Sequence, residues 1–134
     1  LSSQRDALAV LGSQKVGIIQ PYDDSHGERH MTYIREMGLE PLGWECLNTT
    51  FIKLGEVDEN QVLETGRTLC RNHPELDTVY MFCPHYAVIN TIDKLEQEFG
   101  VTVMTSLQAI VWNALRRCGI KDPIEGYGRL FRDF

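Results

Sequence analysis

The sequence of 134 residues contains no block of lysine and arginine, and its net charge is -6. A protein of this charge is not expected to bind nucleic acid or an anionic membrane surface. No apolar stretch reaches the roughly 18 residues that a membrane helix needs. The glycine motifs GxGxxG and GxxxxGK[ST] are absent, so a nucleotide-binding fold would lack its usual phosphate loop.

Cysteine is sparse and widely spaced, at Cys46, Cys70, Cys83 and Cys118. The four cysteines form no CxxC pair, so a zinc site is not expected. Residues 1–10 do not show a basic start followed by an apolar run, which is the pattern of an export signal. We therefore expect a cytoplasmic protein whose thiols stay reduced.

Short apolar runs alternate with segments of helical periodicity along the chain. The expected strands cover residues 15–19, 39–47, 77–83 and 101–104. The expected helices cover 3–11, 25–37, a segment that begins near 58, 86–99, and 106–118. Strands that are apolar throughout are buried on both faces, so this order predicts a parallel sheet between two layers of helices. The expected fold is one α/β domain over residues 1–134, a three-layer sandwich with a four-stranded parallel sheet.

Two of the expected helices have well-defined apolar faces. In the helix over 86–99, an inward face is expected to contain Ile89, Ile92, Leu95 and Phe99. The helix over 106–118 carries an unbroken apolar stripe, which consists of Leu107, Ile110, Val111, Ala114, Leu115 and Cys118. This spacing is typical of an amphipathic helix.

Candidate functional residues follow the expected strands, because ligands of parallel α/β sheets bind beyond the carboxyl ends of the strands. Cys83 is the leading candidate. It is expected between a strand end and a helix N-terminus, whose partial positive charge favours the thiolate over the thiol. The alternative is a buried, inert sulfur, which is the usual environment of a free cysteine.

Four further candidates each have two interpretations. The hydroxyl of Tyr22 could donate a hydrogen bond to a substrate carboxylate, or its ring could pack at the edge of the domain. His85 could tune the thiol or carry a proton, or it could be an ordinary surface residue. Thr105 and Ser106 could bind an anion through hydroxyl groups and helix-start amides, or they could simply cap the helix.

Several blocks together resemble the second half of enzymes in the aspartate/glutamate racemase superfamily. They are "VGIIQPYDDSHGERHMTYIREMGLEPLG", "CPHYAVINTIDKLEQEFGVTVMTSLQAIVWNALRRCGI" and "GYGRLF". The resemblance is closest to the branch of maleate cis-trans isomerases and arylmalonate decarboxylases, and it covers nearly the whole chain.

The resemblance implies a fold of two similar α/β halves, with the active site between them and no metal or organic cofactor. This chain would be a flavodoxin-like, Rossmann-like C-terminal half of a longer two-half enzyme. Cys83 matches the second-half cysteine, which transfers a proton to a carbanion-like carbon. Tyr22 matches a tyrosine that orients a substrate carboxylate, and Ser106 with its neighbour Thr105 matches the carboxylate-binding loop. The implied partners are a small carboxylic acid and either the missing N-terminal half or a second copy facing the cleft, which would make a homo-oligomer.

Three residues depart from the pattern of this superfamily. Pro84 stands where Thr or Gly is usual, and proline has no backbone N–H for a carboxylate. Phe51 lies near the position of an asparagine of the isomerases, and Leu107 replaces a polar residue. Pro84 and His85 are still expected beside the substrate. The three changes favour a monocarboxylate with an apolar group over maleate.

The sequence therefore predicts a cofactor-independent isomerase, racemase or decarboxylase of a small carboxylic acid, in which a cysteine donates and accepts the proton. The alternative is a non-catalytic module that binds small carboxylates on the same scaffold. A receiver-type signalling domain would share the layers. It would need an acidic cluster and a lysine at the strand ends, where this chain has Pro-Tyr and Cys-Pro.

Overall fold

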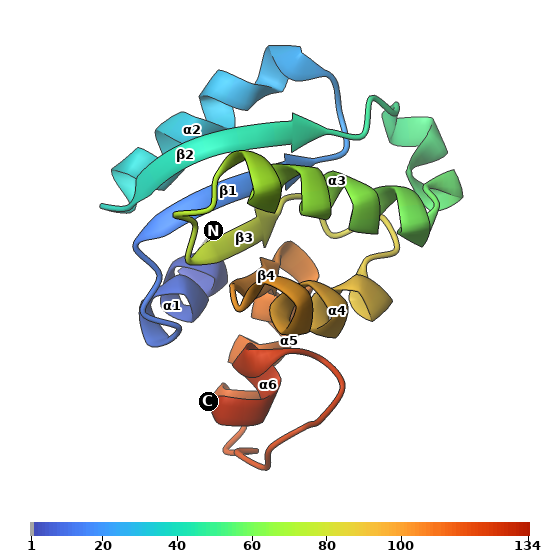
Figure 1. The fold of residues 1–134 in the computed structure, drawn as a ribbon. Coiled ribbons are helices and arrows are strands. Elements are labelled where there is room, and N and C mark those ends of the chain that lie inside the picture. The colour runs from blue at the N-terminus through green and yellow to red at the C-terminus, as the bar shows by residue number, and fades with distance from the viewer. Residues whose placement is uncertain (1) are drawn as a thin grey trace.

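A sheet of four parallel strands forms the centre of the computed structural model, which describes residues 2–134 (Figure 1). The strand order is β2–β1–β3–β4. The strands are β1 (Lys15–Gln20), β2 (Glu40–Cys46), β3 (Thr78–Met81) and β4 (Thr102–Thr105). Pro41 is accommodated in β2 because this strand lies at the edge of the sheet, where a missing N–H is tolerated. The predicted four-stranded parallel sheet is thus confirmed.

Helices cover both faces of the sheet, which gives the predicted three layers (Figure 1). One face packs against α3 (Glu59–Asn72) and α4 (Ile89–Phe99). The other face packs against α1 (Ser2–Val10), α2 (Gly27–Glu36), α5 (Ser106–Arg117) and α6 (Arg129–Asp133). Two 3-10 turns, η1 (Asp24–His26) and η2 (Phe51–Glu56), follow β1 and β2. Within residues 2–134, no helix is both long and apolar enough to cross a membrane.

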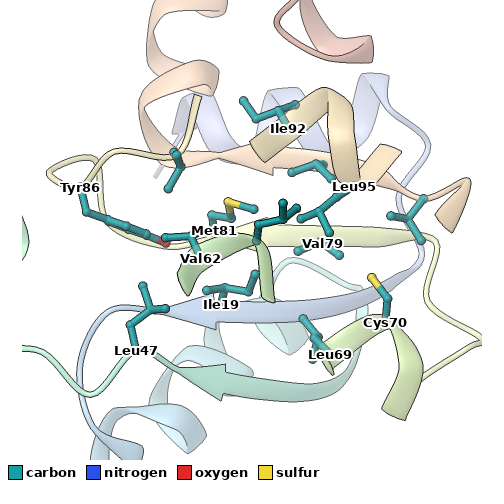
Figure 2. Packing of buried hydrophobic residues seen from close by; sticks show 14 of the residues in the cluster. Ile19, Leu47, Val62, Leu69, Cys70, Val79, Met81, Tyr86, Ile92 and Leu95 are labelled. Carbon is teal, nitrogen blue, oxygen red and sulfur yellow. The ribbon is translucent and has the colours of Figure 1, made fainter. Parts of the chain in front are cut away.

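Successive residues of β3 belong to two separate cores, because side chains alternate across a strand. Val79 and Met81 pack with Leu95 on the α3–α4 side. Tyr80 and Phe82 pack on the opposite side, where the α1, α2 and α5 helices lie. Figure 2 shows the first core, with the ring of Tyr86 reaching into it from the loop after β3. Side chains on both faces of β3 are therefore buried, and packing on both sides fixes the position of its carboxyl end.

The loop between β3 and α4 is longer than the sequence predicts. The prediction of a helix from residue 86 is wrong at this end, since α4 begins at Ile89 and residues 82–88 form neither helix nor strand. Cys83 has a φ of 78°, which ends the extended conformation. Tyr86 and Val88 are buried from the loop itself. Ile89 consequently lies at the helix start and is 48% exposed, contrary to the predicted inward position.

The α5 helix turns a side of mixed polar and apolar residues toward the sheet. Its buried residues are Ser106, Gln108, Ala109 and Trp112. Most of the predicted apolar stripe faces outward, with Leu107 48% and Val111 42% exposed, whereas Leu115 packs against the core. Hydrogen bonds explain this orientation, because the Gln108 side chain donates to the Tyr127 carbonyl at 2.6 Å and the Trp112 indole donates to the Phe134 carbonyl at 2.9 Å. Buried polar groups with partners cost little.

A half-buried histidine on α2 makes stability depend on pH. The His30 ring stacks on Phe82 with centroids 4.3 Å apart, and its Nδ1 has no hydrogen-bond partner among residues 2–134. Burial, with the nearby charges of His26 and Arg29, lowers the pKa of His30 to about 4 from its ordinary value of 6.5. Between these values the unfolded chain binds more protons than the folded chain, so stability falls as the pH falls through this window.

We predict that this loss of stability is smaller in a His30→Phe variant, which keeps an aromatic ring on Phe82 but binds no proton. Between pH 7 and about pH 4.5, the wild type should lose on the order of 1–2 kcal/mol more unfolding free energy than the variant. Urea unfolding at the two pH values measures this difference. Equal losses in the two proteins would show that His30 titrates as it does in the unfolded chain.

Candidate active site

The carboxyl ends of three neighbouring strands bring the candidate residues to one edge of the sheet. Ile19 of β1 pairs with Met81 of β3, and Met81 pairs with Thr105 of β4. Tyr22 therefore follows β1 at the same level at which Cys83 follows β3. The sequence segments at 20–24, 83–86 and 105–108 meet here, as predicted from a parallel sheet.

Cys83 sits in a strained backbone conformation at the centre of this edge. Its φ of 78° is in the left-handed region, which costs a residue with a Cβ roughly 1–3 kcal/mol. Its side chain is partly exposed. The Sγ atom lies 3.8 Å from the Tyr22 hydroxyl oxygen and 3.7 Å from the Nδ1 atom of His85. The loop thus holds the sulfur between two groups that can exchange protons.

The environment of the Tyr22 hydroxyl raises its pKa and so keeps it a hydrogen-bond donor. Burial raises the pKa of Tyr22, and the hydrogen bond to Cys83 and the negative charge of its thiolate raise it further. The phenol therefore stays protonated at neutral pH and can donate to a thiolate or to a substrate carboxylate. The ring of His26 lies beside that of Tyr22, with ring centroids 5.3 Å apart.

Two of the other cysteines are less suited to proton transfer than Cys83. Burial raises the pKa of Cys70 to about 11. Burial also raises the pKa of Cys46, with a contribution from the charge of Asp24. Both thiols are therefore weaker acids than an ordinary cysteine, and among residues 2–134 neither forms a hydrogen bond with Tyr22 or His85.

An apolar cavity of about 500 Å³ opens beside Cys83. Besides Cys83, its lining combines side chains of the β3–α4 loop, α4, α5 and the C-terminal segment, among them Pro84, Ile89, Leu107, Val111, Tyr127 and Phe131. Phe51 lies outside this lining but packs edge-on against His85, with ring centroids 6.0 Å apart. Polar groups thus flank Cys83 on one side and an apolar pocket on the other.

The structure separates the two candidates at the start of α5. Thr105 lines the cavity, and its hydroxyl accepts a hydrogen bond from the Gln108 amide at 3.0 Å as part of a capping box. The Ser106 hydroxyl is buried behind the sheet, 3.1 Å from the Tyr80 hydroxyl. Cys83, Pro84 and Thr105 therefore share the cavity, Tyr22 and His85 contact Cys83 directly, and the Ser106 side chain lies apart from them.

Sequence reasoning missed two contributors to this region. Tyr86 lies in the loop after Cys83, and its buried hydroxyl has no hydrogen-bond partner among the described residues. Tyr127 lies in the C-terminal segment beyond the last expected helix, and its carbonyl accepts a hydrogen bond from the Gln108 side chain. Neither position shows a periodicity that would have indicated a role.

Within residues 2–134, no group of three His, Cys, Asp or Glu side chains is close enough to hold a metal ion.

Comparisons with known proteins agree with this geometry. The sequence profile of the arylmalonate decarboxylase family matches residues 2–131. The arylmalonate decarboxylase of Bordetella bronchiseptica is 28% identical over 128 residues, which cover 94% of this chain and 53% of that protein. The maleate isomerase of Nocardia farcinica (strain IFM 10152) is 26% identical over 129 residues, which cover 95% of this chain and 51% of that protein.

The fold of this chain is also similar to that of a solved relative. A crystal structure of arylmalonate decarboxylase superimposes with a TM-score of 0.86 at 27% identity, over 96% of this chain and 57% of the other. The chain thus spans about half the length of the curated relatives that it matches.

Proposed function

The chain belongs to the arylmalonate decarboxylase family, and from this premise we propose that it supplies the cysteine-bearing half of a cofactor-independent enzyme of small carboxylic acids. The reaction is decarboxylation or isomerisation by way of a carbanion-like intermediate. One observation carries the proposal: the strained Cys83 holds its sulfur 3.8 Å from the Tyr22 hydroxyl and beside an apolar cavity. Strain of this kind clusters at functional sites.

Cys83 is the proton donor in this proposal. In decarboxylation, the bond between the α-carbon and one carboxylate breaks, CO2 leaves, and the electron pair remains as an enediolate. The Cys83 S–H then gives its proton to the α-carbon, which leaves a thiolate. His85 is exposed, with its Nδ1 3.7 Å from the sulfur, and it returns a proton from solvent to that thiolate.

The surroundings of Cys83 suit a substrate with one retained carboxylate and one apolar group. Tyr22 donates to the carboxylate, while the N-terminus of α5, which begins at Ser106 directly after Thr105, favours the negative charge. The apolar group occupies the cavity beside Pro84, where an aromatic ring would replace water against aliphatic side chains. A dicarboxylate such as maleate would find few polar partners on that side.

A second α/β half completes the site in this proposal. Its support is the partial coverage of the relatives, which are about twice as long as the matched region. The cavity also opens to the outside along α5, where Leu107 and Val111 are exposed. Closing this side would exclude water, which strengthens electrostatic interactions with the reacting carboxylate.

The proposal is tested by incubating about 100 μM of the protein that carries this chain together with its second α/β half with phenylmalonate or with maleate in D2O, and following both substrates by proton NMR. Phenylmalonate should lose CO2 and gain one deuteron at the α-carbon of phenylacetate, and it should react faster than maleate. Turnover of maleate alone would overturn the assignment of the apolar group to the cavity.

A non-catalytic carboxylate-binding module is the second candidate, favoured by one observation. Pro84 follows Cys83 directly and lines the cavity, so the amide that could stabilise an enediolate at this position is missing. The same samples decide between the two. If phenylacetate and phenylmalonate raise the melting temperature but neither is converted, the chain is a binder and the catalytic proposal fails.

A further inference from the structure

The C-terminal segment, residues 120–134, forms one wall of the cavity beside Cys83. Figure 1 shows this segment as the loop and the short helix α6 that follow α5. It contributes Ile124, Tyr127 and Phe131 to the lining of the cavity. The segment therefore helps to set the shape of the space that a ligand of Cys83 can occupy.

Hydrogen bonds hold the backbone of this segment on both sides of the Tyr127 side chain. The Tyr127 carbonyl accepts a hydrogen bond from the Gln108 side chain of α5 at 2.6 Å. The next amide, that of Gly128, donates to a carboxylate oxygen of Asp93 on α4 at 2.8 Å. The segment is thus tied to both helices that line the cavity, and at these two points it contributes only backbone atoms, which any residue at position 127 would supply.

Two glycines give the backbone at Tyr127 its path. Gly126 and Gly128 have φ values of 87° and 78°, in the left-handed region that glycine adopts without strain. A Cβ atom at Gly128 would also lie only 2.5 Å from the Cγ2 atom of Ile92, another residue of the cavity lining. The close approach to α4 therefore requires glycine at this position, and the Tyr127 ring is the one side chain that residues 126–128 bring to the cavity.

The Tyr127 side chain lines the cavity without being part of the folded core. It is 41% exposed and belongs to neither of the two cores of residues 2–134. Its ring meets the buried ring of Phe131 edge-on, with centroids 6.3 Å apart. Phe131 and Ile92, in contrast, line the cavity from within the cores. A substitution at Tyr127 should therefore change the cavity and leave both cores intact.

We propose that Tyr127 determines specificity: the apolar group of the substrate packs on its ring, so that a large planar group is bound in preference to a methyl group. The inference rests on the proposed function, which places the apolar group in this cavity. Packing of two aromatic rings contributes more than the burial of their area alone. Because Phe131 and the fixed backbone already hold the Tyr127 ring, little freedom is lost when a ligand packs on it.

Alkylation of Cys83 by two 2-bromo acids tests the proposal in the protein that carries this chain together with its second α/β half. The reagents are 2-bromo-2-phenylacetate, which carries a phenyl group, and 2-bromopropionate, which carries a methyl group. In both reactions the Cys83 thiolate displaces bromide from the α-carbon, so a C–S bond forms as the C–Br bond breaks. Mass spectrometry of the Cys83 peptide gives the two rates. Their ratio cancels any change in the acidity of the thiol, because both reagents react with the same thiolate.

Tyr127→Ala should lower the ratio of the phenyl rate to the methyl rate by about fivefold or more, through the loss of one aromatic contact and its buried area. Tyr127→Leu should lower it in the same direction, and it replaces the alanine variant if circular dichroism shows the latter to be unfolded. Tyr127→Phe keeps the ring and should keep the wild-type ratio. Phe134→Ala is the matched control and should also keep it, since Phe134 is 39% exposed in the same segment but outside the cavity lining.

An unchanged ratio in Tyr127→Ala would overturn the proposal, and a raised ratio would show that the ring is a barrier rather than a contact. An equal fall in Tyr127→Phe would assign the selection to the hydroxyl, and an equal fall in Phe134→Ala would assign it to the segment as a whole; both overturn the role of the ring. The readout needs no turnover. If phenylmalonate is converted but the ratio ignores Tyr127→Ala, this inference alone fails. If the ratio responds but phenylmalonate is not converted, only the catalytic proposal fails.

Discussion

Replacing Cys83 by alanine or serine should lower turnover of phenylmalonate by between about 10²- and 10⁴-fold, the usual contribution of a positioned acid or base. The reason is geometric. The sulfur is placed by the left-handed backbone between Tyr22 and His85, and a serine hydroxyl is a much weaker acid than a thiol. Initial rates of CO2 release from wild type and variants measure the effect.

Cys46→Ser is the matched control for this prediction. Cys46 ends the edge strand β2, which β1 separates from β3. It is partly exposed like Cys83, and it contacts the Gln20 side chain at 3.1 Å rather than Tyr22 or His85. Its replacement should leave turnover within about threefold of the wild type. Normal turnover in Cys83→Ala would show that Cys83 is structural.

The backbone strain at Cys83 can be tested by comparing the stability of two variants, Cys83→Gly and Cys83→Ala. Glycine adopts a φ of 78° without strain, whereas alanine does not. We expect Cys83→Gly to be as stable as Cys83→Ala or more stable, by up to about 1 kcal/mol, although glycine normally loses such a comparison. A Cys83→Ala variant clearly more stable than Cys83→Gly would remove the argument that strain is kept here for function.

The fold could be predicted from the sequence because its strands are apolar on both faces. Val79, Tyr80 and Met81 are all fully or almost fully buried, and such runs occur in parallel sheets covered by two helix layers. The meeting of Tyr22, Cys83 and Thr105 at one edge follows from that arrangement, whereas the strand order β2–β1–β3–β4 does not. Here local pattern and tertiary structure agree.

The details of the site could not be predicted, because they depend on tertiary contacts that leave no periodicity. The helical pattern in the sequence predicted that α4 begins at residue 86. In the structure Tyr86 and Val88 are buried from a loop, and α4 begins only at Ile89. Apolar spacing on α5 identified a stripe but not its direction. Gln108 and Ser106 are drawn inward by specific hydrogen bonds, and polar residues with partners can outcompete an apolar face for the interior.

Replacing Tyr22 by phenylalanine should selectively weaken recognition of a carboxylate at Cys83. We predict that alkylation of Cys83 by iodoacetate slows by about tenfold or more, as expected for the loss of one hydrogen bond to a charged group. Alkylation by iodoacetamide, which presents an amide in place of the carboxylate, should change much less. Because the pKa of Tyr22 is raised, the difference between the two reagents should persist from pH 7 to about pH 9. Mass spectrometry of the Cys83 peptide gives both rates.

Tyr33→Phe is the matched control, because the Tyr33 hydroxyl on α2 accepts a hydrogen bond from the Arg29 side chain at 3.0 Å and does not contact Cys83. It should leave the ratio of the two alkylation rates unchanged. The two roles open to Tyr22 give different results. If Tyr22 acts only by donating to the thiolate, its loss changes both reagents equally, and the ratio stays that of the wild type. An unchanged ratio in Tyr22→Phe would therefore assign the 3.8 Å contact to the sulfur alone and remove Tyr22 from carboxylate binding.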